Sequence, residues 1–383
     1  MNPQFETMPV SIFEEMSLAA TRHGAVNLGQ GFPDFGWPEP LLDEAARLLR
    51  KGSNQYPPSR GLPVLREALA DFYAERQSLA LAPEQFVVTS GATEAIAAVL
   101  LAAIEPGDGA IVIAPAYDAY APLIRRAGGD VQEVVLRPPS WRIDKALLAG
   151  AVTPATRLLV VNNPHNPTGR VLDAAELQAV VEIAREHDLL IVSDEVWEEV
   201  LAPRARFTSL ASLAPERTIK IGSAGKIFSL TGWKVGWAVA PESLAGVIAR
   251  AHQYLTFATP PHLQAAVAEG LRHPEWLHAP RVGFARARQR LADGLERSGF
   301  ALLPSEGTYF QCIDLAASGI SLDDRAFADL AVAEAGVAVI PLSPFTEGEP
   351  ERGLVRLCFA KHDATIDAGI AALAKARDLA RAR

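Results

Sequence analysis

The sequence has little cysteine and no excess of positive charge. Only Cys312 and Cys358 occur in its 383 residues, and both stand in apolar, strand-like segments. No disulfide framework is therefore expected, and both thiols are predicted to be buried in a reducing compartment. The 36 Lys and Arg residues are outnumbered by 45 Asp and Glu, which gives a formal net charge of -9. Because nucleic acids and anionic membranes favour basic surfaces, neither is expected as a partner.

Long hydrophobic runs are also missing. No apolar stretch reaches the roughly 20 residues that a membrane-spanning helix needs. The start, MNPQFETMPV, lacks the basic and apolar regions of a secretory signal. We therefore expect a cytoplasmic protein. At roughly 100–200 residues per domain, the length allows two or three domains with large cores.

Apolar runs alternate with helical patterns through the middle of the chain, which indicates an α/β fold with a mostly parallel central sheet. The runs are apolar throughout, as expected for strands covered by helices on both faces. The predicted strands are residues 84–89, 109–114, 130–135, 157–161 and 189–192. Ligands bind such sheets beyond the carboxyl ends of the strands, so the residues after each run are the informative ones.

The C-terminal sequence has a different pattern. From about residue 276, a long helical segment and shorter strands predict a smaller α+β domain. We expect a large domain over residues 39–275 and a small C-terminal domain over residues 276–383. Residues 1–38 are expected to form an N-terminal arm that packs on the small domain.

The segment VVTSGATEA places Gly91, Ala92 and Thr93 between a predicted strand and a helix. Such a turn presents free backbone N–H groups and the positive end of a helix dipole, which suit a phosphate. A glycine that serves only packing would give the same pattern.

The segment VVNNPHNPTG follows another predicted strand and contains Asn166 in a loop stiffened by prolines. Its amides can be held at defined positions toward a ligand. A plain Asn/Pro turn is the alternative.

The segment LLIVSDEVW puts Asp194 at the end of a strand predicted to be buried. A buried carboxylate is costly unless a cation or a donor meets it. Asp194 could hold a protonated ring nitrogen, ligate a metal or cap a helix. Glu195 is expected to face a structural partner.

The segment SAGKIFSLTGWKVGW carries Lys226 and Lys234 between two apolar runs. Burial disfavours the ammonium, so the pKa of such a lysine falls and its neutral amine becomes a nucleophile that can bond an aldehyde. A structural ion pair is the alternative. Together, the four segments supply a phosphate cradle, an anion for a pyridinium, an amide for a phenolic oxygen and an amine for an aldehyde. Pyridoxal phosphate (PLP) requires all four groups, and the set predicts this cofactor.

Further motifs extend this pattern over nearly the whole chain. In order, they are VNLGQGFPDF, NQYPPSRGLPVLREALA, SGATEA, PAYDAY, NNPHNPTG, SDEVW, SAGKIFSLTGWKVGW, HQYLTF, EGTYF and VRLCFAK. In this arrangement the sequence resembles the class I/II aminotransferases of PLP fold type I. It is most similar to the branch of methionine, kynurenine and glutamine–phenylpyruvate aminotransferases. The resemblance implies a PLP enzyme with no metal.

The resemblance implies a role for each matched position around the cofactor. Lys226 would bond the aldehyde and move the proton, and Asp194 would keep the pyridine nitrogen protonated. Asn166 would bind the phenolic oxygen, and Tyr117 would stack on the ring. The residues implied for the phosphate are Gly91, Ala92, Thr93, Ser223 and Lys234.

The resemblance also implies how substrate and subunits meet. Arg356 would grip the α-carboxylate in a bidentate fork, and Gly31 would let the backbone approach that group closely. Tyr56 would reach the phosphate from a neighbouring subunit, which implies a homodimer with shared active sites. One position departs from the family, which usually has tyrosine after SDEV. Here Trp197 stands there, with an indole that can donate but not ionise.

The implied activity is a ping-pong transamination between an L-amino acid and a 2-oxo acid. Aromatic residues expected near the substrate favour a neutral, bulky or thioether side chain, as in methionine, glutamine, phenylalanine or kynurenine. These residues are Phe13, Tyr56, Phe257 and Phe345. Two alternatives stay open: a PLP-dependent cysteine-S-conjugate C–S β-lyase on the same fold, and a succinyl-diaminopimelate aminotransferase.

Overall fold

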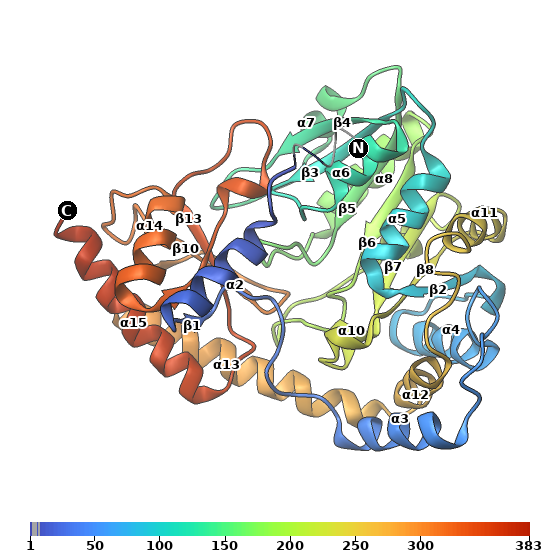
Figure 1. Ribbon diagram of the computed structural model, residues 1–383. Helices are drawn as coiled ribbons and strands as arrows, with labels where there is room; N and C mark the ends of the chain where they lie inside the picture. Colours follow the sequence, from blue (N-terminus) through green and yellow to red (C-terminus); the bar gives the residue numbers. More distant parts are fainter. Residues whose placement is uncertain (2–5, 7) are drawn as a thin grey trace.

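The computed structural model describes the chain except residues 2–5 and 7, and the described residues form a seven-stranded, a four-stranded and a two-stranded sheet (Figure 1). The larger sheet has seven strands in the order β2-β8-β7-β6-β5-β3-β4. Within it, β8 runs antiparallel to both neighbours and the other strands pair in parallel. Its strands are β2 (Phe86–Ser90), β3 (Gly109–Ala114), β4 (Asp130–Val135), β5 (Thr156–Asn162), β6 (Leu190–Asp194), β7 (Thr218–Ser223) and β8 (Val235–Val239).

The predicted mostly parallel α/β sheet is confirmed, with strand ends that differ by one or two residues from those expected. The side chains of β5 show why its run is apolar throughout. Leu158 and Val160 lie in one core, whereas Leu159 and Val161 lie in another on the opposite face. Since successive strand residues point to opposite faces, a strand buried on both sides has no polar alternation.

Helices cover both faces of this sheet (Figure 1). One face packs against α5 (Gly91–Ala103), α6 (Tyr120–Ala127) and α11 (Glu242–His252). The other face packs against α7 (Lys145–Ala151) and α8 (Ala174–Glu186), and near β2 and β8 against α4 (Pro63–Gln77) and α12 (Pro261–Leu271). The helix α3 (Glu39–Lys51) packs on α12.

The second sheet is formed by the C-terminal part of the chain. Its four strands are antiparallel, in the order β12-β13-β10-β9. They are β9 (Ala301–Leu302), β10 (Phe310–Asp314), β12 (Ile340–Pro341) and β13 (Leu354–Cys358), with the helices α13 (His278–Arg297), α14 (Asp324–Leu330) and α15 (Asp363–Arg381). Cys312 in β10 and Cys358 in β13 are both free and buried, as expected from the sequence.

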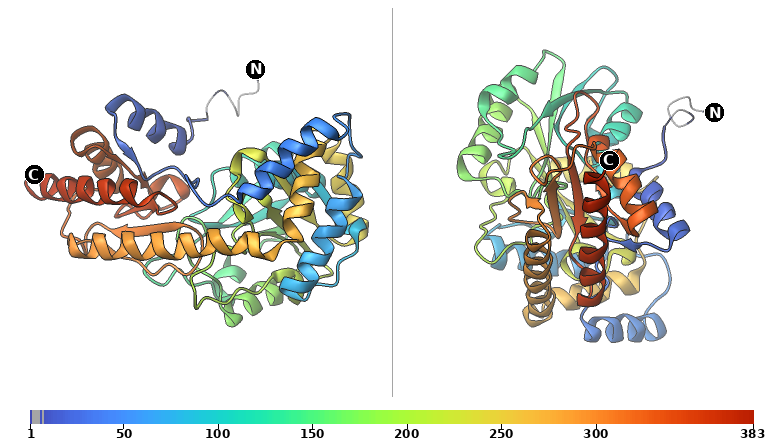
Figure 2. Two further views of the ribbon diagram at one scale, coloured as in Figure 1. Left: turned by 90° about the horizontal axis from the view of Figure 1, so that it is seen from below. Right: turned by 90° about the vertical axis from the view of Figure 1, so that its left-hand side faces the viewer.

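The N-terminal segment lies against this C-terminal part (Figure 2). Its strand β1 (Val26–Asn27) pairs in parallel with β11 (Val337–Ala338), and α2 (Ile12–His23) packs beside them. None of the helices in the described part of the chain has the length and apolar character to cross a membrane.

Candidate active site

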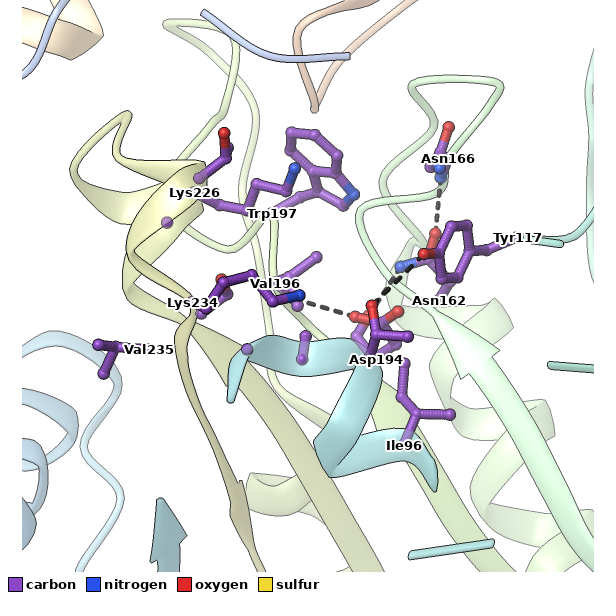
Figure 3. A pocket seen from close by; sticks show the side chains of 16 residues that line it. Ile96, Tyr117, Asn162, Asn166, Asp194, Val196, Trp197, Lys226, Lys234 and Val235 are labelled. Atoms are coloured by element: carbon purple, nitrogen blue, oxygen red, sulfur yellow. Dashed lines mark hydrogen bonds between the residues drawn. The ribbon is translucent and has the colours of Figure 1, made fainter. Parts of the chain in front are cut away.

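The carboxyl ends of β2, β7, β6 and β5 lie at one edge of the large sheet, with the antiparallel strand β8 between β2 and β7. There the segments after β2, β5, β6 and β7 line a single cavity (Figure 3). The predicted site residues in its wall are Gly91, Ala92, Thr93, Tyr117, Asn166, Asp194, Trp197, Ser223, Lys226 and Lys234. Gly31 and Arg356 lie beside the cavity: the Gly31 carbonyl accepts a hydrogen bond from Tyr309, and Arg356 donates to Asn166.

One end of the cavity is shaped by a close approach of two backbones. A Cβ added to Gly236 in β8 would lie 2.5 Å from the carbonyl carbon of Gly91 and 2.7 Å from the nitrogen of Ala92. Gly91 itself has φ +76°, and a Cβ there would lie 3.1 Å from Nζ of Lys234. The first N–H groups of α5 have no acceptor within the helix. This end therefore combines free donors, a helix dipole and a cation, and it fits a phosphate dianion.

The opposite wall contains a buried acid. Asp194 is 4% exposed and accepts hydrogen bonds from the Tyr120 hydroxyl (2.5 Å) and the Val196 backbone N–H (3.3 Å). Burial raises the pKa of Asp194, and the two donors oppose that rise. The side-chain amide of Asn162 donates to the Asp194 carbonyl at 2.9 Å and ties the ends of β5 and β6 together. A carboxylate fixed in this way fits a protonated ring nitrogen.

Lys226 lies in the wall of the same cavity, on the short helix α10 (Ala224–Ile227). Burial lowers the pKa of Lys226 to about 8, so a substantial fraction of its amine is neutral near physiological pH. Its Nζ donates to the Tyr309 hydroxyl at 3.1 Å, and that hydroxyl donates to the Gly31 carbonyl at 2.6 Å. The ring of Trp197 lies 4.6 Å from Nζ. Trp197 therefore contacts the amine through its aromatic face.

Arg356 is buried beside the cavity, and its Nη1 donates to Oδ1 of Asn166 at 2.7 Å. This bond leaves the amide N–H groups of Asn166 to face the cavity. The guanidinium stacks on Phe310 at 3.8 Å and lies near Phe13 and Phe345. Burial lowers the pKa of Arg356 to about 10, so it remains a cation at neutral pH and can bind a carboxylate.

Tyr56 lies away from this cavity within the chain. Its side chain is 87% exposed and packs edge-on against Phe257, with ring centroids 5.5 Å apart. Phe13 and Phe345 form a second pair at 5.6 Å. The aromatic residues expected around the substrate thus form two separate pairs, and only the second lies near Arg356.

The structure also reveals contacts that sequence reasoning missed. Tyr120 holds Asp194, and Tyr309 holds Lys226. The available signal for Tyr120 is that it is the second tyrosine of PAYDAY, and its ring packs edge-on against Tyr117 with centroids 5.6 Å apart. Glu195 was expected to face a structural partner, and it pairs with Lys220 inside the large sheet.

The donors at α5, the buried acid, the amide of Asn166 and the amine of Lys226 line one cavity and match the phosphate, ring nitrogen, phenolic oxygen and aldehyde of PLP. They define a PLP-dependent enzyme of fold type I. The chain belongs to the aminotransferase class I and II family, whose sequence model matches residues 24–373. Members of this family use PLP, and the protein is an aminotransferase.

Individual relatives cover almost the whole chain. The probable N-succinyldiaminopimelate aminotransferase DapC of Mycobacterium tuberculosis is 42% identical, over 94% of both chains. The methionine aminotransferase of Escherichia coli is 38% identical, over 95% of this chain and 94% of the relative. The solved structure of N-succinyldiaminopimelate aminotransferase from Mycobacterium tuberculosis superposes with a TM-score of 0.95 at 42% identity, over 98% of this chain and all of the other.

Proposed function

We propose that this aminotransferase moves the amino group of a neutral, aromatic or sulfur-containing L-amino acid to a 2-oxo acid by a ping-pong mechanism. Donors of this kind are methionine, glutamine, phenylalanine and kynurenine. The support comes from charge: in the cavity wall, as far as the structure describes it, the cations are Lys226 and Lys234. Both serve the cofactor in this proposal, and Arg356 serves the α-carboxylate. No basic group of this chain then remains there for a second, distal carboxylate.

Bound PLP supplies an aldehyde that takes up the amino group and a ring that accepts the electron pair of the α-carbon. The amine of Lys226 would hold the aldehyde between turnovers and take the proton from the substrate α-carbon. Asp194 would keep the pyridine nitrogen protonated, and Tyr117 would pack on the ring. Asn166 would bind the phenolic oxygen, and it accepts a hydrogen bond from the guanidinium of Arg356, which would bind the α-carboxylate.

The phosphate would be held by residues at the carboxyl ends of β2 and β7 and by the turn that precedes β8. These are the α5 N-terminus with Gly91, Ala92 and Thr93, the hydroxyl of Ser223, and the ammonium of Lys234. Trp197 packs against the amine of Lys226 at the position where the family usually has tyrosine.

A panel of single half-reactions tests the proposal. The PLP-loaded protein is mixed with each amino acid, and the absorbance of the lysine-bound cofactor is followed. Methionine, glutamine, phenylalanine or kynurenine is expected to remove this absorbance and to yield the matching 2-oxo acid. Lys226→Ala is expected to abolish this reaction. Discharge by aspartate or glutamate alone would contradict the proposed substrate class, and full activity of Lys226→Ala would contradict the assignment of the amine.

N-succinyl-diaminopimelate is a second candidate donor, because the probable N-succinyldiaminopimelate aminotransferase of Mycobacterium tuberculosis is 42% identical to this chain. It belongs in the same panel. If it removes the absorbance of the lysine-bound cofactor far faster than methionine does, the preferred donor is the anionic substrate and not a neutral amino acid. Release of pyruvate and ammonia from a cysteine S-conjugate, without dependence on an oxo acid, would instead identify the C–S β-lyase.

We also propose a homodimer in which Tyr56 completes the partner's site. Tyr56 and Tyr254 are 87% and 85% exposed, and the ring of Phe257 packs on Tyr56. Exposed aromatic clusters of this kind are typical of subunit interfaces. Mixing inactive Lys226→Ala with weakened Tyr56→Phe chains is expected to restore one intact site in each mixed dimer. A monomer in sedimentation experiments, or no restoration of activity, would contradict the shared site.

A further inference from the structure

Glu94 places a carboxylate in the first turn of α5, beside the proposed phosphate site. Its Oε2 accepts hydrogen bonds from the backbone N–H of Ser90 (2.5 Å) and from the Thr256 hydroxyl (2.9 Å). The side chain is only 9% exposed. A negative charge in this position repels a phosphate dianion bound at the same helix end. The carboxylate therefore needs a cation that neutralises it.

His252, at the end of α11, meets that carboxylate. Its side chain is fully buried, with Nδ1 2.6 Å from Glu94 Oε1 and Nε2 2.8 Å from the Ser59 carbonyl oxygen. Both partners are acceptors, and a neutral imidazole has one N–H, so only the doubly protonated ring satisfies both contacts. Burial lowers the pKa of His252, but the hydrogen bond and charge of Glu94 outweigh burial and the pKa is raised.

The pair formed by His252 and Glu94 connects three segments of the chain. Ser59 belongs to the loop that carries Tyr56, and Thr256 precedes Phe257, whose ring packs on Tyr56. Glu94 belongs to the helix whose N-terminus faces the cavity. The contacts of His252 and Glu94 together thus fix the position of this helix end relative to both aromatic loops.

We infer that His252 is a positioning residue for the cofactor phosphate: as a buried imidazolium, it cancels the charge of Glu94 and so sets the affinity of the α5 N-terminus for a dianion. The inference rests on the proposed phosphate contacts and does not depend on which amino acid is the donor.

His252→Gln tests this, because it keeps a donor toward Glu94 and removes the positive charge. The dissociation constant of PLP, measured by absorbance titration of the full-length protein, is expected to rise on the order of tenfold. The dissociation constant of pyridoxal, which has the aldehyde and ring without the phosphate, is expected to change by less than about twofold. Glu94→Gln combined with His252→Gln removes both charges and is expected to recover most of the PLP affinity. Thr256→Val removes a hydrogen bond from the same carboxylate without changing charge, and it is the matched control.

Equal losses for PLP and pyridoxal would mean a general structural role and would overturn the inference. So would a double variant as weak as His252→Gln alone, or a loss of the same size in Thr256→Val. Lys234→Ala tests the phosphate contacts independently. If it leaves the preference for PLP over pyridoxal unchanged, the proposed phosphate site is wrong. If it removes that preference while His252→Gln does not, only the role of His252 is wrong.

Discussion

Lys220 in β7 lies buried between two acids, and loss of its charge is expected to destabilise the folded protein. Its Nζ contacts Glu195 and lies 2.6 Å from Oε2 of Glu198, and all three side chains have zero exposure. Glu198 also accepts a hydrogen bond from the Tyr73 hydroxyl at 2.8 Å. Lys220→Met keeps much of the volume but leaves two carboxylates without a cation. Breaking a buried pair from one side costs about 3–5 kcal/mol, and we expect a loss of this size in the free energy of unfolding at pH 7.5.

The loss should depend on pH in a definite direction. Without the lysine, the two buried carboxylates can lose their charge by binding protons. Their pKa values in the folded variant therefore rise above those in the unfolded chain. An acid with a raised folded pKa loses stability as the pH rises, because the folded state binds more protons than the unfolded state. Lowering the pH by 1.5 units makes protonation of one carboxylate easier by about 2 kcal/mol. Lys220→Met should therefore lose about 2 kcal/mol less at pH 6.0 than at pH 7.5.

Urea unfolding followed by circular dichroism, at fixed PLP concentration and at both pH values, measures this. The control is the triple variant Lys220→Met, Glu195→Gln and Glu198→Gln, which has no buried charge and is expected to recover most of the loss. A cost below about 1 kcal/mol for Lys220→Met at pH 7.5, or the same cost at both pH values, would refute the reasoning.

Three further predictions concern the site. Gly91→Ala adds a Cβ at φ +76° and 3.1 Å from a lysine Nζ, so PLP affinity should fall on the order of tenfold or more. Gly107→Ala, at φ +93° with nothing within 4 Å, carries the same backbone strain and should leave the affinity unchanged. Arg356→Lys removes the bidentate fork and should raise KM for every amino acid on the order of tenfold or more, with a smaller effect on kcat; a change confined to one substrate would contradict this. Trp197→Leu removes the aromatic face that stabilises the Lys226 ammonium, so the pKa of Lys226, about 8, should fall further. The pH dependence of amine acylation in the cofactor-free protein measures that pKa, and an unchanged or higher value would count against the contact.

The parts of this protein that the sequence predicts best are those with a local signal. The central strands of the large sheet, such as β3 and β5, are mostly apolar runs, since helices bury both faces of the sheet there, whereas the edge strand β4 contains polar residues. Asp194 and Ser223 end such runs, and Gly91 directly follows one, so their meeting at one edge follows from parallel strand geometry. The family motifs then supply roles that spacing alone leaves open.

What escaped prediction depends on contacts between distant segments. Glu94 and His252 are 158 residues apart, and nothing local distinguishes this histidine from a surface one. Tyr309 reaches Lys226 only because the C-terminal part of the chain closes over the cavity edge. Sequence patterns indicate that a side chain is buried, but they do not indicate which group forms a hydrogen bond or an ion pair with it.

Lys226 and Lys234 lie on the single connection between β7 and β8, where the sheet reverses direction. With the proposed roles, one segment of the chain binds the cofactor at two points, the aldehyde at Lys226 and the phosphate at Lys234. In the proposed turnover, Lys226 would release the cofactor in every cycle, while the phosphate contacts at Lys234 would persist. The released end would then stay at an effective concentration on the order of millimolar or above, which favours its return to the same amine. The antiparallel turn of β8 would thereby slow the loss of the cofactor during turnover.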